Sequence, residues 1–93
     1  MQFEWDEEKN RRNKAKHGIS FELAVQVWND PAHWCYFDRF EGDEMRMHCV
    51  GTVGTATILL VVYVDKELDG EEITRIIGAR RATAHEKRAY THG

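Results

Sequence analysis

The apolar positions of this chain are concentrated in its centre. Ile58 to Val64 is the longest apolar run, and a strand over residues 56–64 would be apolar on both faces. That pattern is typical of the middle strand of a sheet that is covered on both sides. Phe3–Trp5 and residues 72–81 predict two further strands.

Residues 34–40 and 44–53 predict a β-hairpin, with Glu41-Gly42-Asp43 as a three-residue loop. If the loop is symmetric, its register sends alternate pairs of residues to opposite faces of the sheet. The mostly apolar face would hold Cys35–Cys49, Phe37–Met47 and Arg39–Met45, and the other face Tyr36–His48, Asp38–Arg46 and Phe40–Glu44.

Capping residues define three helices. Asp6 is suited to begin a first helix that ends before Gly18, and Ser20 to begin a second. Thr83 and Glu86 form a capping box for a last helix. The second helix has one apolar stripe at i, i+3, i+4, i+7 spacing: Phe21, Ala24, Val25 and Trp28.

We therefore predict an α+β fold in a single domain over residues 1–93. Two N-terminal helices would pack on one face of a four- to five-stranded, largely antiparallel sheet, and a short C-terminal helix would follow. Asp65 to Glu71 is expected to form a charged surface loop. The sheet face opposite the helices would be partly open.

Composition supports a soluble globular protein, with 42% apolar and 31% charged residues. The N-terminus lacks the basic and apolar regions of a signal peptide, so we predict a cytoplasmic location. Cys35 and Cys49 would then be reduced. The net charge of −3 is unfavourable for nucleic-acid binding, but basic residues cluster over positions 9–17 and 75–88.

Arginines are the first candidates for chemistry. Arg46 has the geometry to clamp a phosphate, or it forms an ion pair with Asp38. One of Arg75 and Arg80 should share the open face with it. The pattern predicts opposite faces for these two, and a seven-residue loop before the strand leaves the choice open.

Proton transfer has fewer candidates. Glu44 and His48 would lie on the open face, and His17 ends a basic run. Tyr90 is either a packing anchor of the last helix or a residue that stacks on a base. No ligand spacing for a metal and no glycine-rich phosphate loop is present, so we predict no cofactor.

The chain resembles the BrnT toxins. The resemblance rests on an opening block, Phe3-x-Trp5-Asp6 followed by Lys16-His17-Gly18-Ile19-Ser20-Phe21-Glu22, and a closing block, Arg75-Ile76-Ile77-Gly78-Ala79-Arg80-Arg81. Between them Glu44, Arg46, Gly51 and Leu60-Val61-Val62 also fit. Gly78 replaces an expected serine, and Arg81 stands where lysine is common.

The resemblance implies a RelE-like ribonuclease toxin of a type II toxin–antitoxin system, which arrests translation. Its partner would be a BrnA-type antitoxin that carries a DNA-binding domain. Catalysis without a metal would involve Arg46, Arg80 or Arg75, Glu44 and His17. RNA would be contacted by Lys14, Lys16, Arg81 and Tyr90. The alternative is a non-enzymatic module that only binds a regulatory protein.

Overall fold

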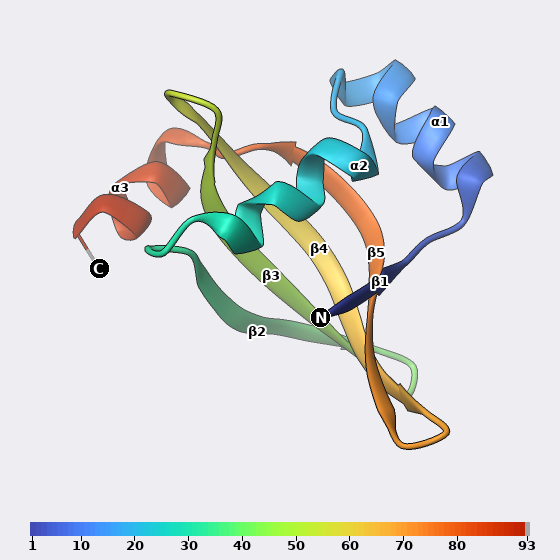
Figure 1. Cartoon of the computed structure of the whole chain (residues 1–93). Helices are drawn as coiled ribbons and strands as arrows, with labels where there is room; N and C mark the ends of the chain where they lie inside the picture. Colours follow the sequence, from blue (N-terminus) through green and yellow to red (C-terminus); the bar gives the residue numbers. More distant parts are fainter. Residues whose placement is uncertain (93) are drawn as a thin grey trace.

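A computed structural model describes residues 1–92 and contains one five-stranded sheet, with the N-terminal helical segments on one face and the last helix near one end (Figure 1). The strand order is β1-β5-β4-β3-β2, and only the β1–β5 pair is parallel. The strands are β1 (Gln2–Glu4), β2 (Trp34–Glu41), β3 (Glu44–Val53), β4 (Thr57–Leu68) and β5 (Glu71–Arg81). The helices are α1 (Glu7–His17), α2 (Phe21–Ala24), the 3-10 helix η1 (Val25–Asn29) and α3 (Ala84–His92). The predicted α+β class is confirmed.

The predicted helix caps are confirmed by their hydrogen bonds. The Asp6 carboxylate accepts from the backbone N–H groups of Glu8 and Lys9 at 2.8 and 3.1 Å. Gly18 ends α1 with a φ of 74°, a left-handed conformation that favours glycine. The Ser20 hydroxyl accepts from the Leu23 N–H at 3.1 Å.

The second helical segment differs from the prediction because it tightens after one turn. With three residues per turn in η1, Phe21, Ala24 and Val27 fall in one fully buried row, and Val25 turns partly outward. Trp28 is half-buried and packs on the Phe3 and Tyr63 rings, at centroid distances of 5.2 and 5.1 Å.

The main core lies between these helical segments and the sheet. Phe21 and Val27 meet the buried strand residues Leu59, Val61 and Ile76. At Gly51 the contact is so close that a Cβ atom would lie 2.7 Å from Val27 Cγ1. The close packing of η1 on β3 therefore requires glycine at position 51.

Two asparagines of α1 fasten the helix to the rest of the fold. β1 pairs with β5 only over Ile73 to Arg75. Further along the same edge of β5, the Asn13 side chain accepts a hydrogen bond from the Ala79 N–H at 3.2 Å and donates one to the Ala79 carbonyl oxygen at 2.8 Å. The buried Asn10 amide accepts from the Phe21 N–H at 2.8 Å. The side chain of Asn13 thus takes the place of a strand at an otherwise open edge.

The β2–β3 hairpin is partly as predicted. Cys35–Cys49, Tyr36–His48 and Phe37–Met47 are opposed in the register. The pairs predicted for Asp38, Arg39 and Phe40 are wrong, because the turn is the two residues Gly42-Asp43 and Asp38 forms a bulge. Arg39 therefore lies opposite Arg46, and Phe40 opposite Met45.

The predicted loop from Asp65 to Glu71 is also wrong. β4 and β5 continue through it and join in a two-residue turn, Asp69-Gly70, with φ angles of 53° and 81°. Positive φ at both positions is the geometry of a tight hairpin turn, and Asp-Gly is a favourable sequence for it. The resulting hairpin projects beyond the sheet (Figure 1).

The prediction of reduced thiols is wrong for this structure, in which Cys35 and Cys49 form a disulfide. Their direct opposition on β2 and β3 places the Cα atoms 4.0 Å apart, so the two sulfur atoms meet. Within residues 1–92, no helix has the length and apolar character needed to cross a membrane.

Candidate active site

The sheet face opposite α1 and α2, called the open face here, brings together side chains that are distant in sequence. Tyr36 lies opposite His48, His48 opposite Val62, and Val62 opposite Gly78. Residues opposed in this way on neighbouring strands share a face of the sheet. One row thus runs across the open face from β2 to β5.

Arg75 and Arg80 both lie on the open face, which corrects the prediction that they point to opposite faces. Arg80 is opposite Leu60 and Arg75 is opposite Val64, and these two β4 residues point to the same side. Ile77 has no partner in the register, so it adds one residue to β5 as a β-bulge. This extra residue reverses the alternation between the two arginines.

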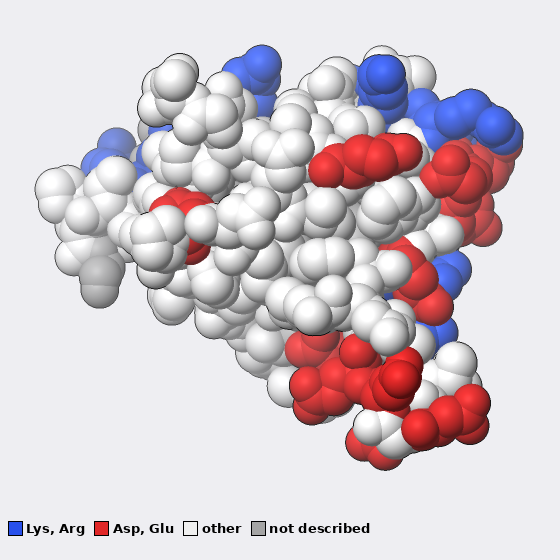
Figure 2. Space-filling model, viewed as in Figure 1, with Lys and Arg blue, Asp and Glu red and all other residues white. Residues whose placement is uncertain are grey.

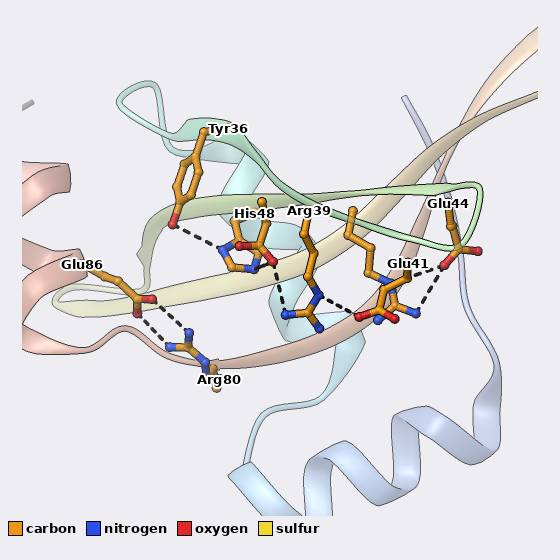
Figure 3. Close-up of polar contacts among 9 residues, drawn as sticks. Tyr36, Arg39, Glu41, Glu44, His48, Arg80 and Glu86 are labelled. Atoms are coloured by element: carbon orange, nitrogen blue, oxygen red, sulfur yellow. Dashed lines mark hydrogen bonds and ion pairs between the residues drawn. The ribbon is translucent and has the colours of Figure 1, made fainter.

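Tyr36, His48 and Asp38 form a polar group on this face, towards the β2 edge of the sheet. Figure 3 shows Tyr36 and His48 of this group. His48 Nδ1 lies 3.4 Å from the Tyr36 hydroxyl, and His48 Nε2 lies 3.4 Å from Asp38 Oδ2. Burial lowers the pKa of His48, against the opposing effect of the Asp38 carboxylate. Burial also raises the pKa of Tyr36. At neutral pH the group therefore offers an uncharged imidazole and a protonated phenol.

Arg80 is anchored beside this group by Glu86 of α3. Its Nη1 and Nη2 atoms donate to the two Glu86 carboxylate oxygens at 2.7 and 2.9 Å. The same carboxylate accepts from the Thr83 N–H at 2.8 Å, and the Glu86 N–H donates back to the Thr83 hydroxyl at 3.2 Å. The predicted capping box is therefore confirmed, and it also holds the arginine. These contacts, those with Arg80 above all, lower the pKa of Glu86 to about 2.

Arg46 and Glu44 lie together at the hairpin end of β3. The Arg46 guanidinium contacts Glu44 Oε1 at 3.3 Å, and neither a hydrogen bond nor an ion pair joins it to Asp38, the partner considered from the sequence. Asp38 instead lies 3.6 Å from Arg39, which also donates to Glu41 at 2.7 Å. Arg46 is thus paired with an exposed carboxylate, and an ion pair at such a position contributes little to stability.

Arg75 forms an ion pair with Glu4 at the β1 edge of the sheet. Its Nη1 donates to Glu4 on β1 at 2.8 Å, and Lys66 contacts the same carboxylate at 2.6 Å. Lys66 and then Arg75 lower the pKa of Glu4. Arg75 thus fastens β1 to β5.

The remaining predicted residues do not join the open-face group. His17, Lys14 and Lys16 are exposed on α1, and Arg81 is opposite Leu59, whose side chain enters the helix-covered core. The Tyr90 hydroxyl contacts Thr52 Oγ1 at 3.0 Å and donates to Asp30. These bonds match the packing-anchor interpretation of Tyr90.

Sequence reasoning placed Tyr36 and His48 opposite each other but ranked other residues above them as catalytic candidates. The available signal was their cross-strand register combined with the titratable side chains. No feature of the sequence indicated the contact between Asp38 and His48, because that contact depends on the bulge at Asp38.

Charge is unevenly distributed over the face of the molecule drawn in Figure 2. Acidic side chains gather over the projecting β4–β5 hairpin, whereas lysines and arginines are most frequent at the opposite edge over α1, with acidic side chains beside them (Figure 2). A polyanion would approach the basic edge more readily than the acidic end.

Comparison with known proteins agrees with this fold. The crystal structure of the ribonuclease toxin BrnT from Brucella abortus is similar, with a TM-score of 0.62, 26% identity, and coverage of 89% of this chain and 97% of that chain. No curated protein matches the chain. The BrnT_toxin family, described as "Ribonuclease toxin, BrnT, of type II toxin-antitoxin system", matches residues 5–86. The chain therefore belongs to the BrnT family of ribonuclease toxins.

Proposed function

We propose that this protein is a RelE-like toxin that cleaves RNA in the cytoplasm, arrests translation, and is neutralised by a BrnA-type antitoxin. Family membership supports the toxin class and the ribonuclease activity. The observation that carries the assignment of the site is the group formed by Tyr36, His48 and Asp38 beside Arg80. Together these side chains supply a base, an acid and a positive charge, which promote proton transfer and stabilise a developing negative charge.

In the proposed reaction, His48 takes the proton of a ribose 2′-hydroxyl. The 2′-oxygen forms a bond to the adjacent phosphorus, and the bond from phosphorus to the 5′-oxygen breaks. Tyr36 protonates the leaving 5′-oxygen and regains a proton from His48 through their 3.4 Å contact. The products are a 2′,3′-cyclic phosphate and a free 5′-hydroxyl, and both side chains return to their first protonation states.

The arginines would stabilise the charge that develops on the phosphoryl oxygens. Arg80 presents its remaining N–H groups next to the His48 row, with its orientation fixed by Glu86. Arg46 approaches from the hairpin end. Glu44, the base predicted from the sequence, instead positions Arg46 in this proposal. Arg75 and His17 have no direct role in it.

The decisive experiment compares two variants that break the same ion pair. Arg80→Ala removes the guanidinium, whereas Glu86→Gln removes its partner and leaves the guanidinium in place. We expect Arg80→Ala to lower RNA cleavage by at least about 100-fold, the scale of one lost charge-stabilising group. Glu86→Gln should retain most of the activity. Equal loss in both folded variants would make Arg80 a purely structural residue and contradict the proposal.

His48→Gln and Arg46→Ala complete the test. His48→Gln should lower the cleavage rate by about 10²–10⁴-fold, as expected for loss of a proton-transfer group. Arg46→Ala should reduce cleavage without changing the melting temperature, and Arg46→Lys should restore part of it. Arg12→Ala, at an exposed position on α1, is the matched control, and the rates are compared at saturating RNA so that weaker attraction of RNA to the basic edge does not enter. Full activity in both His48→Gln and Arg46→Ala would exclude the open face as the site.

A non-enzymatic role remains the competing proposal, and one contact favours it: Glu86 already neutralises Arg80. Expression of the chain alone separates the two proposals. The ribonuclease proposal predicts growth arrest with loss of cellular mRNA, and the binding-only proposal predicts intact mRNA. An adjacent small gene for a DNA-binding protein would further support the toxin–antitoxin assignment.

A further inference from the structure

Three potential metal ligands meet on the helix-covered side of the sheet, at the start of β2. His33, Cys35 and Cys49 each offer one ligand atom, and these atoms all lie within 4.8 Å of one another. Cys35 and Cys49 point away from Tyr36 and His48, because neighbouring residues of a strand face opposite sides. This cluster is therefore separate from the candidate active site.

We propose that the protein, once its disulfide is reduced, binds one Zn²⁺ ion through His33, Cys35 and Cys49. Zinc bonds to sulfur at about 2.3 Å and to imidazole nitrogen at about 2.0–2.1 Å. Two ligands of one tetrahedral ion are consequently about 3.5–3.8 Å apart. The three donor atoms already lie within 4.8 Å of one another, so this spacing requires the two sulfur atoms to separate after reduction and the exposed His33 side chain to adjust.

His33 is held in place for this role. Its N–H donates to the Asp30 carbonyl oxygen at 3.0 Å, and its ring Nδ1 lies 2.7 Å from the same oxygen. The Asp30 carboxylate accepts in turn from the N–H groups of Ala32 and Thr52, at 2.9 and 2.8 Å. A histidine that ligates a metal usually donates its second ring N–H to such an acceptor. Among residues 1–92, His33 Nε2 has no hydrogen bond and is available to the ion.

The chemistry of the donors selects the ion. Thiolates and imidazole favour zinc and other soft or borderline ions over Mg²⁺ and Ca²⁺, which prefer oxygen. Two thiolates and a neutral imidazole balance the charge of a divalent ion. This balance matters because Cys49 is completely buried and an uncompensated charge beside it would be strongly unfavourable. The exposed side of His33 leaves the fourth coordination position to water.

The disulfide and the metal exclude each other. A dithiol or phosphine reductant supplies two electrons and opens the sulfur–sulfur bond, and each sulfur takes up one proton. Zinc binding then releases these two protons to solvent as the thiolates coordinate. The two cysteines would therefore be joined by a covalent bond under oxidising conditions and by a metal ion under reducing conditions.

The test uses the full chain, reduced with a phosphine and kept free of oxygen, with Co²⁺ as a spectroscopic probe for the zinc site. We expect one equivalent of Co²⁺ to produce a thiolate-to-cobalt charge-transfer absorption that Zn²⁺ abolishes by displacement. His33→Gln should weaken binding by at least about tenfold. Cys35→Ser and Cys35→Ala should remove most of the absorption. His85→Gln, an exposed histidine on α3, is the matched control and should bind as the wild type does.

Absence of the absorption with stoichiometric Co²⁺ would overturn the proposal, as would unchanged affinity in His33→Gln. Circular dichroism of each variant verifies that it is folded. Since the measurement is metal binding, its outcome does not depend on whether the open face cleaves RNA.

Discussion

Glu86 is the residue on which both Arg80 and the start of α3 depend. The pKa of Glu86 is lowered from 4.5 to about 2, so folding favours its charged form. Its contribution to stability is complete above about pH 4.5 and is lost as the pH falls towards 2. We expect Glu86→Gln to lower the free energy of unfolding at pH 7 by about 1–3 kcal/mol, a range reduced for the partial exposure of Arg80.

Urea unfolding at pH 7 and pH 3 checks this expectation. The difference between the wild type and Glu86→Gln should shrink at pH 3, where the wild-type carboxylate begins to protonate. Glu67→Gln, at an exposed hairpin position, should be neutral at both pH values. A Glu86→Gln difference that stays constant with pH would mean that the Arg80 pair does not stabilise the fold.

His48 makes a second, kinetic prediction about pH. Because burial lowers its pKa, the imidazole should remain an uncharged base below pH 6.5, the ordinary pKa of histidine. The acidic limb of the kcat/KM profile for RNA cleavage should therefore have its midpoint below 6.5. Asp38→Asn removes the group that raises this pKa and should move the midpoint further down. An upward shift in Asp38→Asn would show that another group controls the rate.

At the scale of elements, two strand glycines should respond differently to the same substitution. In Gly51→Ala the new Cβ would lie 2.7 Å from Val27 Cγ1 and 3.0 Å from the Val27 carbonyl oxygen, which cannot rotate away. We expect a loss of about 1–3 kcal/mol in unfolding free energy. In Gly78→Ala the nearest atom would be Asn13 Oδ1 at 3.8 Å, an ordinary contact. That variant should be neutral or more stable by up to about 1 kcal/mol. Equal urea midpoints for the two variants would contradict the packing of η1 on β3.

The elements that could be predicted are those fixed by local chemistry. Asp6, Ser20 and Thr83 each mark a helix start because their side chains bond N–H groups a few residues away. The symmetric hairpin register also identified Tyr36–His48 and Cys35–Cys49. In both cases the determining contacts lie close in sequence or follow directly from strand alternation.

Two errors about which face a side chain occupies involved single inserted residues. Asp38 and Ile77 each add one residue to a strand, and each reverses the alternation beyond it. The first bulge separated Arg46 from Asp38, and the second brought Arg75 to the same face as Arg80. No local sequence feature distinguishes these positions, since a bulge is selected by packing across the whole sheet. The Asp69-Gly70 turn, by contrast, had a recognisable sequence that the long-loop interpretation overlooked.

At the scale of the whole molecule, the acidic hairpin should weaken RNA binding from a distance. Its exposed acids, Asp65, Glu67, Asp69, Glu71 and Glu72, are accompanied by one lysine, Lys66. The triple variant Glu67→Gln, Asp69→Asn, Glu72→Gln removes three negative charges from a net charge of −3. We expect about two- to tenfold tighter RNA binding at low salt, and no difference at high salt, because the Debye length is about 10 Å at 0.1 M. Asparagine also tolerates the positive φ of Asp69.

Binding measured at several salt concentrations checks this prediction, with the cleavage rate at saturating RNA as its control. That rate should not change, because none of the three residues lies on the open face near His48. A tighter complex that persists at high salt would instead indicate a direct RNA contact at the hairpin.

Under oxidising conditions, the bond between Cys35 and Cys49 favours the correct alignment of β2 during folding. β2 is an outermost strand, where a slip by one residue is least opposed, and such a slip would carry Tyr36 through the sheet to the wrong side. Because each cysteine is the chain neighbour of one member of the Tyr36–His48 pair, only the correct alignment allows the sulfur atoms to meet. The disulfide on one face of β2 therefore also fixes Tyr36 on the opposite face, where the candidate active site lies.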